Sequence, residues 1–270
     1  MRTSIFIILA ICISFASCEK VIDIPLDEAE QRIVVEGKMK DNEGDNYILL
    51  SKTGSVYDDS GFEKISGASV TVNDGTTTYT FPENELVAGR YELESFTTQP
   101  NKTYTLTVDL GDGQVLSSTS VTNDKPTIDE LYFEPQKNFF ADFDPTQPDT
   151  VYQVFYNFSD NGAQENYYRI NAWINGERDE TYYIFDDRLF NGENNIAPLW
   201  GAVIEAGDTV SVELVSSDEA YYTYLFTLAN SSDGGPFSAT PANPVSNIDG
   251  DAIGYFAAMT TDTMTIIIPE

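Results

Sequence analysis

Apolar and polar residues alternate in a series of short runs along most of this chain. Clear examples lie at residues 33–39, 69–72 and 104–110, and turn-forming residues follow at 73–75 and 111–113. Alternation with a period of two is typical of β-strands with one buried face, because successive side chains point to opposite sides of a sheet. The pattern therefore predicts a mainly β protein with short connections between its strands.

Residues 32–122 contain such runs without an intervening helical pattern, which favours an antiparallel β-sandwich. Within this segment, Gly-Ala-Ser-Val-Thr-Val at 67–72, Gly-Arg-Tyr at 89–91 and Lys-Thr-Tyr-Thr-Leu at 102–106 resemble prealbumin-like and carboxypeptidase-regulatory-like sandwiches. We therefore expect an N-terminal prealbumin/Ig-like β-sandwich domain. The resemblance concerns fold alone and implies no activity.

The second predicted domain covers residues 123–270 and begins where Asn-Asp-Lys-Pro at 123–126 interrupts the strand pattern. It is rich in Phe and Tyr, and the same alternation predicts that it is mostly β. Its expected strands lie at 151–159, 167–175 and 209–215.

Two stretches of this second domain depart from simple alternation. Residues 134–150 contain three prolines and predict a long loop, because proline cannot donate a backbone hydrogen bond to a sheet. The final apolar run at 264–268 has no polar face. It predicts a buried strand, or a strand that a partner covers.

One segment has helical rather than strand periodicity, at about residues 217–230. Ser216 and Glu219 have the spacing of a capping box, in which each side chain bonds a free amide at the start of a helix. Tyr221, Leu225 and Leu228 follow at intervals that place them on one face. The segment therefore predicts one α-helix docked on the second domain.

The N-terminus has the layout of a secretory signal peptide at residues 1–17. Arg2 precedes an apolar stretch shorter than the roughly 20 residues that span a bilayer, and small residues stand directly before Cys18. A cysteine in this place resembles the lipobox of bacterial lipoproteins, whose cysteine is acylated after cleavage. We therefore expect a covalent lipid on Cys18 and an acidic tether at residues 18–31. An ordinary signal peptide followed by a chance cysteine is the alternative.

Composition narrows the range of functions. The chain has 44 acidic and 14 basic residues, for a net charge of −30, so nucleic acid is not expected as a partner. Such a surface suits calcium, cationic ligands or basic partners, although solubility alone would also explain it. The chain contains no histidine, which excludes Ser-His-Asp and Cys-His nucleophilic systems and the usual zinc sites.

The densest group of oxygen ligands is a candidate calcium site. Asp186, Asp187 and Glu193 stand among several asparagines, and calcium takes six to eight oxygen ligands. No EF-hand pattern fits the segment. Turn formation, in which Asp and Asn bond their own backbone, is the alternative explanation.

Three threonines are candidate sites of O-glycosylation. Thr150, Thr209 and Thr263 each follow an aspartate and precede an apolar residue, a pattern that resembles the O-glycosylation motif of Bacteroidota. Asp-Thr also occurs where a turn enters a strand, so the pattern has a structural explanation as well.

Several short motifs occur in an order that resembles one known family. They include Ser-Cys-Glu-Lys-Val-Ile-Asp-Ile at 17–24, Ile-Val-Val-Glu-Gly at 33–37, Glu-Asn-Tyr-Tyr-Arg at 165–169 and Gly-Tyr-Phe at 254–256. Together they resemble a Bacteroidota outer-membrane lipoprotein family that is defined only as a domain of unknown function, with members encoded beside Sus-type TonB-dependent transporters. The resemblance implies a lipid-anchored, surface-facing outer-membrane protein and no catalytic residue.

From these features we expect a non-enzymatic accessory lipoprotein of a TonB-dependent β-barrel, acting in nutrient uptake by substrate capture or as a lid or subunit. The aromatic C-terminal half is the expected contact surface, since aromatic residues dominate interface cores. The alternative is a free-standing surface protein that binds glycans or peptides. A carboxylate-based hydrolase is less favoured, because no acidic pair stands in an apolar setting that would raise a pKa.

Overall fold

The computed structural model describes residues 30–44, 46–54, 61–181, 183–201, 203–232 and 243–270. The predicted signal peptide, Cys18 and most of the tether lie outside these residues. The described part is mainly β, with four sheets and one α-helix, which confirms the expected fold class. No helix in this part of the chain is both long and apolar enough to cross a bilayer.

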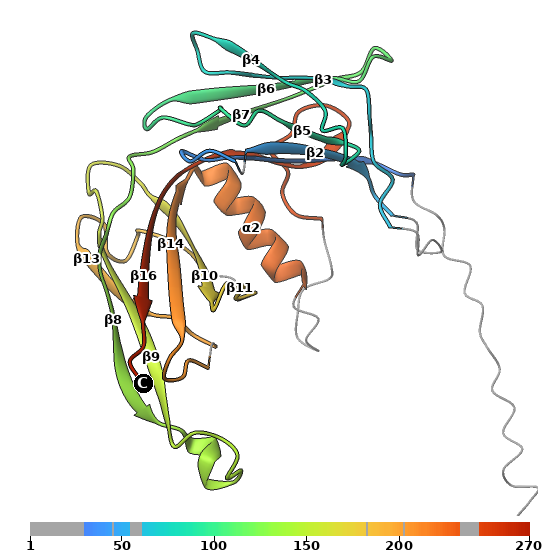
Figure 1. The fold of residues 1–270 in the computed structure, drawn as a ribbon. Coiled ribbons are helices and arrows are strands. Elements are labelled where there is room, and N and C mark those ends of the chain that lie inside the picture. The colour runs from blue at the N-terminus through green and yellow to red at the C-terminus, as the bar shows by residue number, and fades with distance from the viewer. Residues whose placement is uncertain (1–29, 45, 55–60, 182, 202, 233–242) are drawn as a thin grey trace, which may run out of the picture.

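Two four-stranded sheets pack face to face and form the sandwich seen at the top of Figure 1. One sheet has the order β15-β1-β2-β5, from β15 (Ala252–Ala258), β1 (Ile33–Met39), β2 (Tyr47–Lys52) and β5 (Arg90–Glu92). The other has the order β4-β3-β6-β7, from β4 (Thr78–Phe81), β3 (Ser69–Asn73), β6 (Thr103–Asp109) and β7 (Val115–Val121). Their inward residues, among them Val35, Leu50, Val72 and Leu106, form one core.

The C-terminal strand β15 completes this first core. It runs parallel to β1, with Gly254 opposite Val35, and its Phe256 is fully buried among the core residues. Gly254 has φ +119°, and a Cβ there would lie 1.9 Å from the Val35 carbonyl oxygen, so only glycine fits. The predicted boundary at 122/123 falls between two strands, yet a strand from beyond it is part of the first sheet.

A second core lies between the two remaining sheets. The five-stranded sheet has the order β11-β10-β14-β16, from β11 (Glu177–Arg178), β10 (Tyr167–Ile174), β14 (Thr209–Ser217) and β16 (Thr260–Ile267), and β12 (Tyr183–Asp186) also pairs with β10. The three-stranded sheet has the order β13-β9-β8, from β13 (Asn194–Pro198), β9 (Thr150–Ser159) and β8 (Ile128–Lys137). Aromatic residues fill much of this core, including Phe158, Tyr168, Phe185 and Phe190.

The predicted loop at 134–150 is wrong at its N-terminal end. Strand β8 continues to Lys137, and Pro135 pairs in register with Tyr152 of β9. Since β8 is at the edge of its sheet, the proline's missing N–H leaves no neighbouring strand without a partner. Only the tip of the hairpin departs from strand geometry, and it contains the short 3-10 helix η1 (Phe139–Asp142).

The helix α2 (Glu219–Ser232) begins two residues later than predicted, and the predicted capping box is wrong. Ser216 belongs to β14, where it pairs with Tyr168 and its hydroxyl has no hydrogen-bond partner among the described residues. Because the sheet fixes Ser216, the cap is Asp218 instead. Its Oδ1 accepts a 2.9 Å bond from the Tyr221 amide, and its Oδ2 accepts a 2.5 Å bond from the Ser120 hydroxyl of β7.

The last strand, β16, was expected to be buried on both faces, and the structure differs from this expectation. Half-buried and exposed residues alternate from Asp262 to Ile267, and Ile267 is mostly exposed. Met264 and Ile266 pack on the second core, while the opposite face lies open in the described structure. Of the two predicted alternatives, the buried strand is therefore wrong, and coverage by a partner stays a prediction.

Candidate functional site

A polar cleft of about 340 Å³ opens where the two cores meet below helix α2. Strand periodicity supplies its walls. On β10, Arg169, Asn171 and Trp173 line the cleft, whereas the alternate residues of the strand face the second core. On β1, Glu36 and Lys38 line it in the same way. Residues of β11, β14 and α2 complete the lining, among them Arg178, Glu213, Tyr221 and Tyr224.

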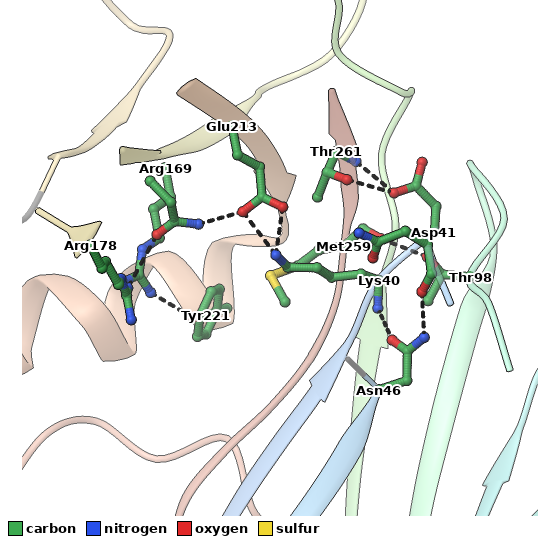
Figure 2. A network of polar contacts seen from close by, with 12 residues as sticks. Lys40, Asp41, Asn46, Thr98, Arg169, Arg178, Glu213, Tyr221, Met259 and Thr261 are labelled. Carbon is green, nitrogen blue, oxygen red and sulfur yellow. Dashed lines mark hydrogen bonds and ion pairs between the residues drawn. The ribbon is translucent and has the colours of Figure 1, made fainter. Parts of the chain in front are cut away.

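A buried ion pair between Lys40 and Glu213 is part of the lining of this cleft, and Figure 2 shows the pair. Lys40, directly after β1, places its Nζ 2.6 Å and 2.8 Å from the two carboxylate oxygens of Glu213 on β14. The side chains are only 7% and 5% exposed. Because an unpaired charge at such a depth is costly, loss of either side chain would leave the charge of the other buried and uncompensated. The pair joins the N-terminal sheet to the second core.

Further polar contacts fix the backbone around the ion pair. The Lys40 amide donates a 2.5 Å bond to Asn46 Oδ1, and the Asn46 amide group donates to the Phe96 carbonyl. Nearby, Asp41 Oδ1 accepts a 2.9 Å bond from the Thr261 amide at the start of β16, as Figure 2 shows. These bonds hold the end of β1 against the strands that follow β15.

A line of hydrogen bonds leads from the ion pair to the mouth of the cleft. Asn171 donates a 2.7 Å bond to Glu213 Oε2, and its side-chain oxygen accepts a 3.3 Å bond from Arg178. A two-residue hairpin turn places Arg178, since Asn175 and Gly176 both have positive φ, at 52° and 83°. This is the geometry that an Asn-Gly hairpin favours.

Arg169 on β10 donates a 3.0 Å bond to the Tyr221 hydroxyl of α2.

The cleft has a different charge balance from the rest of the chain. Basic and acidic residues are equal in number along the lining, against 14 basic and 44 acidic residues in the whole chain. The basic residues are Lys38, Lys40, Arg169 and Arg178, and the acidic ones are Glu36, Asp179, Glu180 and Glu213.

Two of the predicted calcium ligands lie in a separate pocket of about 280 Å³ beside the start of α2. Asp186 forms a 2.7 Å ion pair with Arg188, and this contact holds its carboxyl pKa below the usual value. Burial raises the pKa of Asp187, whose carboxylate accepts a 2.8 Å bond from the Asn166 amide. The two neighbouring carboxylates therefore have opposite shifts in pKa.

The third predicted ligand, Glu193, does not join them. Its carbonyl oxygen, rather than its side chain, accepts a bond from the Asp160 amide. Among the described residues, no three His, Cys, Asp or Glu side chains are grouped closely enough to hold a metal ion. The structure thus does not bring the three predicted residues together, and calcium binding stays a prediction.

The three candidate glycosylation sites differ in exposure. Thr150 is the first residue of β9 and is exposed, and Thr263 is exposed on β16. Thr209 begins β14, is half-buried, and donates its amide hydrogen to Asn175 Oδ1 at 2.9 Å. Thr150 and Thr209 stand where a turn enters a strand, as the structural explanation requires. Glycosylation at these sites stays a prediction.

An apolar cluster lies at the tip of the β8–β9 hairpin, the end farthest from the sandwich in Figure 1. Phe139, Phe140 and Phe143 are 66%, 70% and 74% exposed. Their rings contact one another, with centroids 6.2 Å apart for Phe139 and Phe140 and 5.1 Å apart for Phe139 and Phe143. We refer to these three residues as the aromatic tip. Exposed apolar side chains that gather in this way are typical of contact sites.

Sequence reasoning did not identify the cleft. Lys40 and Glu213 are 173 positions apart, and no local pattern relates them. Arg178 could have been placed, because Asn175-Gly176 between apolar runs is a strong hairpin signal. That turn puts Arg178 opposite Trp173 on the neighbouring strand.

Comparison with known proteins identifies a family but no activity. The family model for a domain of unknown function, DUF4249, matches residues 19–265. No curated protein matches the chain. The match covers both cores, the cleft between them and the aromatic tip, and it confirms the expectation of a domain of unknown function over most of the chain. The chain therefore belongs to the DUF4249 family.

Proposed function

We propose that this protein is a lipid-anchored accessory protein of the outer membrane that docks on a TonB-dependent β-barrel. The observation on which the proposal depends is the aromatic tip. Three phenylalanines stand exposed at the end of a long hairpin, where the second core does not bury them. The signal-like N-terminus, Cys18 and the resemblance to lipoproteins encoded beside Sus-type transporters support the membrane location.

The tip suits a protein partner for energetic reasons. Burial of a phenylalanine side chain contributes about 1.5–3 kcal/mol, and aromatic residues at the centre of an interface often dominate its affinity. Because η1 and the hairpin already fix the backbone that carries these rings, binding loses little backbone conformational entropy. Acidic residues flank the rings, among them Asp142 and Asp144, and they disfavour insertion into an anionic membrane surface.

Affinity purification tests the docking proposal. The tagged full-length protein, extracted from outer membranes in mild detergent, should co-elute with a stoichiometric TonB-dependent barrel. A variant with Phe139→Ser, Phe140→Ser and Phe143→Ser should lose the barrel. Leu86→Ser is the matched control, because Leu86 is almost fully exposed on the sandwich and lies outside the tip. Elution without a barrel, or retention of the barrel by the tip variant, would refute the proposal.

Replacement of Cys18 tests the anchor separately. A Cys18→Ala protein should no longer incorporate a labelled fatty acid, because the proposed lipid is attached to that thiol. Labelling of this variant, or no labelling of the unchanged protein, would contradict lipidation at Cys18.

The cleft favours a second candidate function, a free-standing surface protein that binds a glycan or peptide. A pocket of about 340 Å³ with charged and aromatic walls has the form of a small-ligand site. A protein that elutes alone but binds a soluble ligand would favour this alternative over the docking proposal.

A further inference from the structure

We propose that the cleft below α2 binds a small ligand through a carboxylate group, and that Arg178 is the residue that holds this carboxylate. The inference goes beyond docking on a barrel and does not depend on it. It rests on the position of Arg178, on the engagement of Glu213 and Asp179 by other groups, and on the size and walls of the cleft.

Arg178 has the geometry of a prepared anion-binding group. A guanidinium has five N–H donors, and the hydrogen bond from Arg178 to Asn171 at 3.3 Å uses one of them. Among the described residues, Arg178 forms no ion pair, although the chain has a threefold excess of acidic residues. The Asn175-Gly176 turn and the pairing with Trp173 fix its backbone.

Two acidic side chains near Arg178, those of Glu213 and Asp179, are engaged by other groups. Lys40 satisfies Glu213 with two short hydrogen bonds, and Asn171 stands between Glu213 and the guanidinium. Asp179, the next residue in the chain, accepts bonds from the Thr181 amide at 2.9 Å and the Thr181 hydroxyl at 2.7 Å. Its other oxygen accepts a 2.9 Å bond from the Tyr183 hydroxyl. An incoming carboxylate can therefore meet Arg178 without displacing a protein carboxylate.

The cleft also limits the size and character of the ligand. Its volume of about 340 Å³ is near the lower end of the roughly 300–1,000 Å³ usual for small-molecule sites, so a monosaccharide or dipeptide would fill it. Trp173 and Tyr221 provide aromatic surface beside the guanidinium groups of Arg169 and Arg178. The ligand class is therefore a carboxylate with an adjacent face that can pack on aromatic rings, either a sugar acid or an acidic peptide.

Isothermal titration calorimetry on the full-length protein in detergent tests this inference. The two acidic probes are galacturonate and N-acetyl-alanyl-glutamate, and their neutral counterparts are galactose and N-acetyl-alanyl-glutamine amide. One acidic probe should bind at least about tenfold more tightly than its neutral counterpart, because a hydrogen bond to a charged group contributes about 1.5–3 kcal/mol. Binding of galacturonate would identify a sugar-acid site, and binding of the dipeptide would identify a peptide site.

Two arginine variants locate the interaction. Arg178→Gln should weaken binding of the acidic probe at least about tenfold, while Arg178→Lys should weaken it less, because lysine keeps the charge but not the paired donors. Arg188→Gln is the matched control, since Arg188 is exposed and pairs with Asp186 in the other pocket. Circular dichroism confirms that each variant is folded. Binding of neither acidic probe at millimolar concentration, or equal losses for the Arg178 and Arg188 variants, would overturn the inference. Because no barrel is present, this result is independent of the docking proposal.

Discussion

Replacement of Lys40 by methionine should remove a large part of the stability of this fold. The change leaves the Glu213 carboxylate buried beside the second core without its cation, 5% exposed and, among the residues that the structure describes, bonded only to Asn171. Removal of one partner from a buried pair costs about 3–5 kcal/mol, and total stabilities are commonly about 5–15 kcal/mol. Methionine retains most of the aliphatic stem, so the loss measures the charge rather than the packing.

Equilibrium unfolding in urea, followed by tryptophan fluorescence and circular dichroism, provides the assay. The control is Lys52→Met. Lys52 contacts Glu63 at the same 2.6 Å distance, but the two side chains are 36% and 57% exposed, so the loss should stay below about 1 kcal/mol. Both substitutions remove one positive charge from an acidic protein, which makes the long-range electrostatic effect similar. Burial is then the main difference between the two variants.

A double substitution completes the thermodynamic cycle. Lys40→Met combined with Glu213→Leu removes both charges and should be more stable than Lys40→Met alone. Measured together with the Glu213→Leu single variant, the cycle should give a coupling energy of at least about 2 kcal/mol. Equal losses for Lys40→Met and Lys52→Met would refute the argument from burial. A double variant less stable than both single variants would show that the pair is not the source of the effect.

Three further predictions concern stability. Asp218→Ala should lower the free energy of unfolding by about 1–2 kcal/mol in a thermal melt, because it removes the helix cap and the bond to β7. Ser216→Ala should change this free energy little, since that hydroxyl has no partner among the described residues. Gly254→Ala should prevent β15 from pairing and yield little folded protein, whereas Gly111→Ala, also at positive φ but with open space around it, should cost only about 1 kcal/mol. Bonds from Thr76, Thr77 and Lys102 hold the pKa of Asp74 well below its ordinary 3.8. Its contribution to stability is therefore fully present above about pH 4 and decreases as the pH falls from there toward the lower pKa of the folded state, so Asp74→Asn should lower the melting temperature more at pH 7 than at pH 2; equal effects at both pH values would contradict this.

The alternation of side chains determined the strands where one face of a sheet is buried. Ile33–Met39 and Thr103–Asp109 were placed within a residue, because a strand with one apolar face can pair in only one register without exposing its core residues. The Asn-Asp-Gly turn after β3 was likewise evident, since these residues tolerate positive φ. Local chemistry failed at Pro135, which lies in a strand because that strand is at the edge of its sheet.

Tertiary structure alone decided which segments meet. The parallel pairing of β15 with β1, the capping of α2 by Asp218 instead of Ser216, and the Lys40–Glu213 pair all join residues far apart in the chain or depend on a neighbouring sheet. The sequence by itself determined a mainly β chain of strong negative charge, with a helix near its C-terminal end. It did not determine the cleft, because the cleft's charges lie on β1, β10, β11 and β14 or directly after β1 and β11. A local sequence pattern carries no information on contacts between such distant strands.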